Sequence, residues 1–419
     1  MNRLVLIGNG FDLAHGMKTS YADFIHWYKA HRVEMLGQEH SNVSKDHLCT
    51  IELKEHHALS IYISNLLWAK QNWSHEDCFE YIVQNTHEFK YDPSRLLKRI
   101  LNSIETKGWA DIENDYYILL KEYAFPKEAI PSEEKEKKIR ALNRQLEKLQ
   151  DQLIQYLKEV NEQKTNIIDD IKEAIYAPFK ENDIAIAEKK HLQEHVNHWG
   201  NPSYDIVLKD IINLYALDAD EYLSELNAWR NKINHAVCSP YISSCPKAFL
   251  LPNNIMFLNF NYTNIVDQYI KTPDSLVNNH IHGEIAHPES IIFGYGDELD
   301  VRYTELQELG NNDCLKNIKS IRYLEAQNYR NLLSFIESEP FQVLIMGHSC
   351  GNSDRTLLNT IFEHKNCVSI KPYYYITDKE KGTNNYRELA QNISRNFTNM
   401  KLMRDRVVNK TQCEPLLKE

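Results

Sequence analysis

The sequence lacks a long apolar run, and it lacks closely paired cysteines. No apolar stretch approaches the roughly 20 residues that a membrane helix needs, and glycine interrupts the N-terminal segment before a signal-peptide core can form. The eight cysteines are scattered, with no C-x-x-C pair. These absences predict a cytoplasmic protein with reduced cysteines, no membrane partner and no zinc site built from cysteine.

Basic residues are in deficit, because 48 Lys and Arg face 59 Asp and Glu, which gives a net charge of −11 at pH 7. This balance argues against an extended nucleic-acid surface, since binding to the phosphate backbone depends on Lys and Arg. At 419 residues, the chain is long enough for one large domain or for two or three smaller ones.

The sequence does contain short apolar runs, most of them after residue 250. Six are strand candidates, at 3–8, 254–260, 278–283, 290–296, 341–347 and 369–377. Because helical patterns follow several of them, we predict an α/β fold with a parallel, Rossmann-like sheet covered on both faces. Ligands of such sheets bind beyond the carboxyl ends of the strands. The residues expected at that edge include Gly8, Asn261, His282 and Gly347.

A helical segment interrupts this pattern. Residues 132–165 carry apolar side chains spaced alternately three and four apart, with charge almost everywhere else. This heptad spacing predicts a long helix that packs either on a neighbouring helix of the same chain or, as a coiled coil, on a second copy in a homo-oligomer. We therefore interpret 126–204 as a helical insertion in a discontinuous core of 1–125 and 205–419.

The segment "LVLIGNGFDLAHGMKTS" at 4–20 raises the question of a phosphate-binding loop. It is not a P-loop, because five residues separate Gly10 from Gly16 and Met17 precedes Lys18. It also fails the dinucleotide pattern G-x-G-x-x-G, because Leu13 stands where the third glycine belongs. A glycine turn at the end of a strand remains.

A second polar segment, "HIHG" at 280–283, follows an apolar run. On an extended strand, His280 and His282 point to the same side. Such a pair binds a metal only with a third ligand, and none stands at local spacing. Catalytic or ligand-binding imidazoles and hydrogen-bonded structural histidines both remain open.

Taken together, the motifs resemble a known family. The order G-x-G near the N-terminus, then "NFNYT", "HIHG" and "GHSCGNSD", with "GWADIE" at 108–113, resembles the bacteriophage abortive-infection protein AbiH. AbiH is in turn similar to a divergent branch of the sirtuin-like fold. Members of that fold bind NAD, and they either use it in deacylation or destroy the NAD itself. The resemblance implies a phage-defence effector that responds to a phage trigger and that binds or hydrolyses NAD to nicotinamide and ADP-ribose.

The resemblance also implies roles for individual residues. Gly8 and Gly10 would bring the backbone against the pyrophosphate, and Asn261 would lie beside the nicotinamide ribose. His282 would be the base that takes a proton from the ribose hydroxyl, with Gly283 leaving its flank open to a ligand. Asn261 and His282 are thus the implied catalytic residues. The implied NAD-binding residues are Gly8, Asn9, Gly10, Asp12, His15, Gly16, Thr263, Gly283, Gly347 and Ser349.

The sequence departs from the sirtuin pattern in two ways. It has no four-cysteine zinc module, so the resemblance does not imply a protein deacylase. Thr263 stands where many sirtuin-like enzymes have an acid that contacts the nicotinamide amide, and Asp12 stands where sirtuins have a small hydroxyl residue. Asp12 and His15 would also bring charge close to a diphosphate.

Other functions remain open. "RNKINH" at 230–235 matches the R-N-x-x-x-H pattern of HEPN ribonucleases, in which Arg230 and His235 would act at a dimer interface. Their spacing on a helix offsets the two side chains by about 140°. A noncatalytic protein that only senses a nucleotide is the third alternative.

Overall fold

The computed structural model describes residues 1–55, 57–108, 111–198, 211–212, 215, 217–235, 245–270 and 276–418. The chain forms two compact units. Unit 1 comprises Met1–Met17, Lys164–Ile292 and Arg322–Glu419, and unit 2 comprises Lys18–Gln163 and Phe293–Ile321. These divisions do not coincide with the boundaries at 126 and 204 expected from the sequence.

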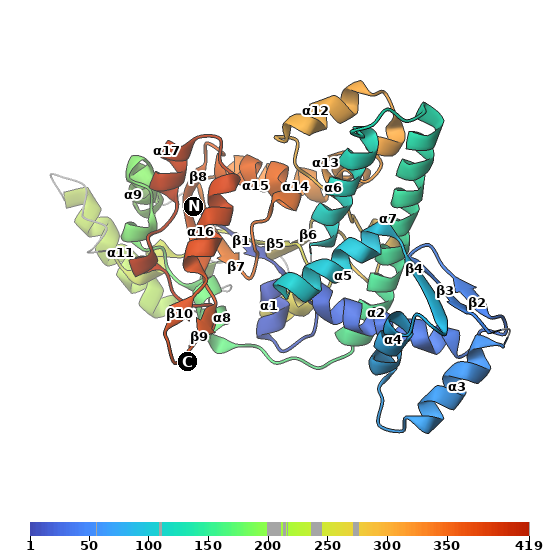
Figure 1. Ribbon diagram of the computed structural model, residues 1–419. Coiled ribbons are helices and arrows are strands. Elements are labelled where there is room, and N and C mark those ends of the chain that lie inside the picture. The colour runs from blue at the N-terminus through green and yellow to red at the C-terminus, as the bar shows by residue number, and fades with distance from the viewer. Residues whose placement is uncertain are drawn as a thin grey trace. The chain divides into compact units, whose positions relative to one another are not determined.

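Unit 1 is built on a five-stranded sheet in which every pairing is parallel (Figure 1). In spatial order its strands are β6 (Leu276–His280), β5 (Ile255–Asn259), β1 (Asn2–Ile7), β7 (Phe341–Met346) and β8 (Cys367–Tyr373). Every residue of β1, β5, β7 and β8 is buried, as continuous apolar runs in a covered parallel sheet require. The predicted α/β fold with a Rossmann-like sheet is confirmed.

The chain winds outward from β1 in two directions. It passes first to β5 and β6 on one side, then returns to β7 and β8 on the other side. This is the doubly wound order, and the direction of winding reverses between β1 and β7. Such a reversal opens a crevice at the carboxyl ends of these two strands, because the connections leave them in opposite directions.

Helices cover the sheet of unit 1. One face of the sheet forms a buried core with the apolar side chains of α14 (Asn328–Ser338), α15 (Arg355–Phe362) and α16 (Tyr386–Arg395). From β1, this core includes Leu4 and Leu6. The remaining α-helices described in unit 1 are α1 (Asn9–Ala14), α8 (Asp169–Tyr176), α9 (Lys189–His198), α11 (Ala219–His235) and α17 (Met400–Arg406).

Two predicted strands differ from the structure. The segment 290–296 is buried but forms no strand: Ile292 donates its amide to the carbonyl of His282 at 2.8 Å, and a Cβ on Gly294 would lie only 2.0 Å from the carbonyl oxygen of Asn317. Its apolar residues are buried in a loop, and its pairing is limited to an isolated parallel bridge between Tyr295 and Ile318. The segment 369–377 is divided between β8 and β9 (Ile376–Asp378), and β9 pairs with β10 (Thr383–Asn384) in an antiparallel ribbon.

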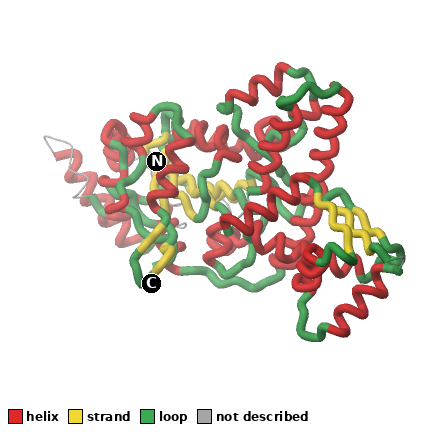
Figure 2. Tube along the Cα trace, in the orientation of Figure 1, coloured by secondary structure: helices red, strands yellow, loops and turns green. Residues whose placement is uncertain are grey.

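Unit 2 contains a second sheet that the sequence did not predict, visible in yellow in Figure 2. Its antiparallel strands are β2 (Val43–Lys45), β3 (Cys49–Leu53) and β4 (Phe89–Pro93). They are short, and burial in β3 alternates, so no continuous apolar run marks them. The helices of unit 2 are α2 (Tyr21–Leu36), α3 (Leu59–Ala69), α4 (His75–Gln84), α5 (Arg95–Lys107), α6 (Ile112–Ala124), α7 (Ser132–Asn161) and α12 (Val301–Glu308), and α13 (Lys319–Arg322) leads back to unit 1.

The heptad seam lies on α7 and is covered by other elements of unit 2. Leu142, Leu146 and Leu149 are at most 1% exposed, and α7 packs on α6 and α2. The predicted long helix is present. Its apolar seam packs on neighbouring helices of the same chain, which is the first of the two arrangements expected from the heptad spacing.

Leu149→Ala should therefore lower the free energy of unfolding by about 2 to 5 kcal/mol, because it empties a packed site. The molar mass in solution should stay unchanged. Urea unfolding and light scattering measure both quantities, with Gln155→Ala at an exposed position of α7 as the control. A mass that falls by half in Leu149→Ala alone would instead indicate a coiled coil between two copies.

Candidate functional site

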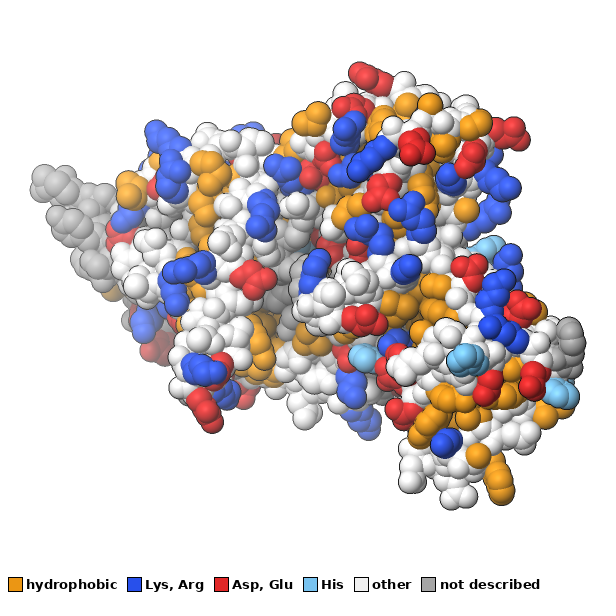
Figure 3. All heavy atoms as spheres, viewed as in Figure 1, with side chains coloured by type: hydrophobic (Ala, Val, Ile, Leu, Met, Phe, Trp, Pro, Cys, Tyr) orange, Lys and Arg blue, Asp and Glu red, His pale blue; other side chains and the backbone are white. Residues whose placement is uncertain are grey.

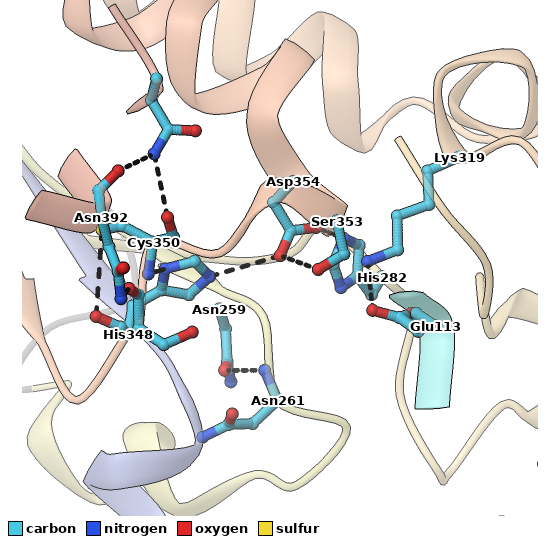
Figure 4. Close-up of polar contacts among 12 residues, drawn as sticks. Glu113, Asn259, Asn261, His282, Lys319, His348, Cys350, Ser353, Asp354 and Asn392 are labelled. Carbon is cyan, nitrogen blue, oxygen red and sulfur yellow. Dashed lines mark hydrogen bonds and ion pairs between the residues drawn. The ribbon is translucent and has the colours of Figure 1, made fainter. Parts of the chain in front are cut away.

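Four loops of unit 1 meet at the carboxyl edge of its parallel sheet. Gly8 follows β1, Asn261 comes after β5, His282 comes after β6 and Gly347 follows β7. This is the edge at which the sequence places a ligand site, and β1 and β7 are the strands between which the winding reverses. The polar side chains gathered here, shown in part in Figure 4, form the candidate functional site.

The glycine loop after β1 packs directly against the loop after β7. A Cβ on Gly8 would lie 2.5 Å from the Cα of His348, and one on Gly10 would lie 2.9 Å from the Cα of Gly347. The amide of Gly10 donates to the carbonyl of Gly347 at 2.8 Å, and the amide of Phe11 donates to the carbonyl of Gly8 at 2.8 Å. These glycines allow the two loops to touch, and these two amides bond to protein carbonyls in this conformation.

The end of α1 accounts for two more of the predicted residues. Gly16 follows the helix in the left-handed region, with φ of 78°, where glycine costs little. The His15 ring lies 2.7 Å from the Phe11 carbonyl through Nδ1 and 2.7 Å from the Tyr269 hydroxyl through Nε2. Burial lowers the pKa of His15, so the imidazole is neutral at pH 7.

Asp12 lies at the centre of a buried polar network. The Asn261 side-chain amide donates to Asp12 Oδ1 at 2.7 Å and to the Gly8 carbonyl at 3.0 Å, and the Thr263 hydroxyl donates to Asp12 Oδ2 at 2.6 Å. Asn259 supports both partners, because its side chain accepts from the Asn261 amide and donates to the Thr263 carbonyl. Three predicted site residues therefore form one cluster with Asn259, a fourth residue that the prediction omitted.

The environment of Asp12 favours its neutral form. Burial raises its pKa to about 7, against the opposing effect of the hydrogen bonds from Thr263 and Asn261. With a pKa of about 7, this carboxyl carries on average about half a negative charge at pH 7. The charges expected from Asp12 and His15 near a diphosphate are therefore both reduced.

The second cluster centres on Asp354, which lies between two imidazoles (Figure 4). His282 Nε2 is 3.3 Å from Asp354 Oδ1 and 3.2 Å from the hydroxyl of Tyr323, and His348 Nε2 is 3.6 Å from Asp354 Oδ2. Asp354, His282 and His348 are all at least 92% buried. The Ser353 hydroxyl lies 3.5 Å from Asp354 Oδ2. A carboxylate that holds an imidazole in this way orients the ring and stabilises its protonated form.

The loop from 347 to 351 fixes the orientation of His348. The amide of Cys350 donates to His348 Nδ1 at 3.0 Å, so Nδ1 is unprotonated and the ring presents Nε2 to Asp354. Cys350 adopts φ of 54°, which is strained for a residue with a side chain. Asn396 of the α16 C-terminus holds this turn by donating to the Cys350 carbonyl at 2.9 Å.

His280 and His282 do not act as a pair. Since β6 ends at His280, His282 lies beyond the alternating pattern, and His280 contacts Asn278 and the Asn261 carbonyl instead. The flank of His282 is not open through Gly283, because a Cβ there would lie 2.3 Å from the carbonyl oxygen of Ser290. In the part of the chain that the structure describes, no group of three or more His, Cys, Asp and Glu residues is arranged to hold a metal ion.

The remaining predicted residues have differing outcomes. Asn9 and Ser349 are exposed at the edge, and the Ser349 carbonyl accepts from Asn392 at 2.9 Å. Arg230 is half-buried on α11, whereas the side chain of His235 lies outside the described residues. The Arg230 and His235 pairing therefore stays a prediction.

The "GWADIE" segment has a structural role in unit 2. Its Trp109 lies outside the described residues. Asp111 caps α6 by accepting from the Asn114 amide at 3.0 Å. Glu113 is buried and forms an ion pair with Lys319 at 2.9 Å, and it also accepts from the Gly294 amide at 3.2 Å.

The prediction omitted His348, Asp354 and Tyr323 from the site. A signal for the first two was present in "GHSCGNSD", which places a histidine directly after an apolar strand and an acid at the start of the next helix. Tyr323 carries no such signal, because it lies in a short 3₁₀ helix far along the chain from His282.

The fold and this edge define a doubly wound α/β protein of Rossmann-like type. Residues 4–375 match the family model described as bacteriophage abortive infection AbiH. Because this match covers most of the chain, the protein belongs to the AbiH family. Its role is in abortive infection, a defence against bacteriophage. Searches of curated proteins and of solved structures return no match.

Two surface properties complete the description. None of the helices within the described ranges has the length and apolar character to cross a membrane. Lys and Arg side chains are interspersed with Asp and Glu on the face drawn in Figure 3. That face presents no continuous basic surface.

Gly8→Ala should destabilise the fold by about 1 to 3 kcal/mol, because the added methyl meets the backbone of His348. The φ of −125° at Gly8 suits any residue, so the cost comes from the contact alone. Gly351→Ala is the matched control, since its Cβ would meet only side-chain atoms at 3.7 Å or more and its φ is −68°. Thermal unfolding of the two variants tests the loop contact, and equal stability would contradict it.

Asp12 should make the protein less stable as the pH rises. Its pKa is about 7 when folded and about 3.9 when unfolded, so the folded state holds the extra proton between these values. The free energy of unfolding should then fall by about 1.4 kcal/mol per pH unit between about pH 4 and pH 7 through this group. Asp12→Asn should remove that slope in urea unfolding, whereas Asp151→Asn, at an exposed position of α7, should retain it.

Proposed function

We propose that this abortive-infection protein binds NAD at the carboxyl edge of its parallel sheet and hydrolyses the bond between nicotinamide and ribose. The observation that carries the proposal is the meeting of both buried clusters at the place where the winding reverses between β1 and β7. Doubly wound sheets bind nucleotides at such reversals. The family supports a role in phage defence, and loss of NAD would deprive an infected cell of its redox cofactor.

The Asp12 cluster supports this choice of ligand. In many sirtuin-like enzymes an acid stands at the position of Thr263, and a small hydroxyl residue stands at the position of Asp12. Here the acid and the hydroxyl have exchanged positions and face each other at 2.6 Å. The same two chemical groups are thus available to the nicotinamide end of NAD, although each comes from the opposite loop.

His282 with Asp354 supplies the base. The bond from nicotinamide to C1′ of the ribose breaks, nicotinamide leaves with the bonding electron pair, and water adds to the oxocarbenium-like carbon. The one proton that the reaction releases passes to His282, whose protonated ring is stabilised by the Asp354 carboxylate 3.3 Å away. Asn261 positions the ribose by accepting from a ribose hydroxyl through its side-chain oxygen, because its amide nitrogen already donates to Asp12 and Gly8.

A nucleotide at this edge has to compete with protein contacts. The Gly10 amide donates to the Gly347 carbonyl, so a diphosphate reaches that amide only when the loop at 347–348 moves away from the loop at 8–10. In the resting state, the two loops are therefore closed against each other. Protection of the Gly10 amide from hydrogen exchange should fall when NAD or ADP-ribose binds and separates them.

His282→Gln should lower the rate of nicotinamide release by about 10² to 10⁴, because it removes the base and keeps a polar side chain of similar size. Purified protein is incubated with NAD, alone and with lysate from phage-infected cells, and nicotinamide and ADP-ribose are measured by chromatography. His287→Gln is the control, since that ring is 65% exposed and lies near Glu284 and Glu289. Circular dichroism checks that both variants fold.

Two outcomes would overturn the proposal. If NAD stays intact under both conditions but calorimetry detects its binding, the protein is a nucleotide sensor without NAD hydrolase activity. If infected cells keep their NAD but lose RNA, and Arg230→Ala and His235→Ala both abolish that loss, the ribonuclease alternative replaces NAD cleavage.

A further inference from the structure

Two side-chain amides at the end of α16 hold the turn that follows β7, residues 347–351. Asn392 of α16 donates through Nδ2 to the Ser349 carbonyl at 2.9 Å. Asn396, the C-cap residue of the helix, donates through Nδ2 to the Cys350 carbonyl at 2.9 Å. Both contacts reach backbone carbonyls, so they restrain the path of the turn itself. We call these two asparagines the asparagine latch.

The latch is anchored in the core of unit 1. Leu389 and Ile393 of α16 are at most 5% exposed and belong to the core on one face of the sheet. Asn359 of α15 donates to the Asn396 carbonyl at 2.9 Å, and Asn396 Nδ2 also donates to the Asn392 carbonyl at 2.9 Å. The position of the latch therefore depends on α15 and α16 and not on the turn that it holds.

The side chain of Asn396 is a poor choice for stability alone. It is completely buried, and among the residues that the structure describes its Oδ1 has no hydrogen-bond partner. A buried acceptor without a donor is unfavourable. An apolar side chain of similar size would fill the same space without this cost, so the property that Asn396 provides is the pair of hydrogen bonds from Nδ2.

The turn is strained in the position in which the latch holds it. Cys350 has φ of 54°, which is unfavourable for a residue with a Cβ. The amide of Cys350 donates to His348 Nδ1, and His348 Nε2 lies 3.6 Å from Asp354 (Figure 4). When the bonds from α16 are lost, less opposes the relaxation of this strained conformation, so the turn should move away from the loop at 8–10.

We propose that the asparagine latch keeps the candidate site closed and that the site opens when α16 releases the turn. Gly347 of the turn accepts from the Gly10 amide at 2.8 Å, which is the amide that a diphosphate has to reach. Asn392 and Asn396 are positioning residues, because they act through the turn. The latch regulates entry to the same site, so the identity of the excluded ligand, NAD, rests on the proposed function.

The purified full-length chain carries its own reporter of this movement. Cys350 is completely buried, and burial raises the pKa of its thiol. Because the thiolate is the reactive form, an alkylating reagent reacts with Cys350 only when the turn opens. Cys367 of β8 is also completely buried and reports unfolding of the sheet. Iodoacetamide is added to the native protein, and mass spectrometry of the peptides follows the alkylation of each cysteine.

Asn392→Ala combined with Asn396→Leu should raise the alkylation rate of Cys350 by about tenfold and leave that of Cys367 unchanged, because two hydrogen bonds to the turn are lost. Asn392→Ala alone, which leaves the core intact, should give a smaller increase. Gln391→Ala, at an exposed position of the same helix, should react like the parent. The proposal fails if both cysteines accelerate together, which indicates a general loss of stability, or if neither accelerates.

Titration calorimetry with NAD and with ADP-ribose separates the latch from the proposed function. The affinity of the double variant should rise by the same factor as the alkylation rate of Cys350, because apparent affinity is proportional to the fraction of protein that is open. Equal affinity in parent and variant overturns the latch as a control of the site. If the turn opens but neither ligand binds to either protein, the proposed NAD function fails, whereas the latch is supported by the alkylation of Cys350.

Discussion

The contact between two backbone loops determines the layout of unit 1. Gly8 and Gly10 lie against Gly347 and His348 so closely that a single methyl group would collide with the backbone. This approach brings the carboxyl ends of β1 and β7 together at the reversal of winding, and it fixes the starting points of α1 and of the turn that leads to α15. Asp12 lies on the first of these segments and Asp354 on the second. Both buried carboxyl groups therefore take their positions from the same glycine contact.

The two carboxyl groups have different kinds of hydrogen-bonding partner. Asp12 meets only neutral donors, from Asn261 and Thr263, and burial raises its pKa to about 7. Asp354 lies between the imidazoles of His282 and His348, and Nδ1 of His348 is unprotonated because it accepts from the Cys350 amide. An acidic side chain whose pKa is shifted by burial, as that of Asp12 is, is typical of functional sites. The shifted pKa of Asp12 and the paired imidazoles of the second cluster support the proposal that this edge is a reaction site.

The same sheet carries polar groups in a second place. Arg3 and Gln342 are paired in register on neighbouring strands, and Lys371 belongs to the next strand. Polar residues inside an otherwise apolar parallel sheet contradict the local pattern, and natural proteins accept such conflicts mainly where function requires them. The polar groups on this face of the sheet are thus separate from the residues gathered at its carboxyl edge.

The sequence by itself determined the elements whose signal is local. The continuous apolar runs predicted β1, β5, β7 and β8, and heptad spacing predicted α7, because burial on both faces or along one stripe fixes which residue types are tolerated. The same local reasoning missed β2 to β4, which are short and only half-buried, and it mistook the apolar loop 290–296 for a strand. Tertiary structure alone decided which polar residues meet. That Thr263 contacts Asp12 and that His282 contacts Asp354 and Tyr323 depends on strand order and loop packing, which join segments far apart in the chain and leave no periodic trace in it.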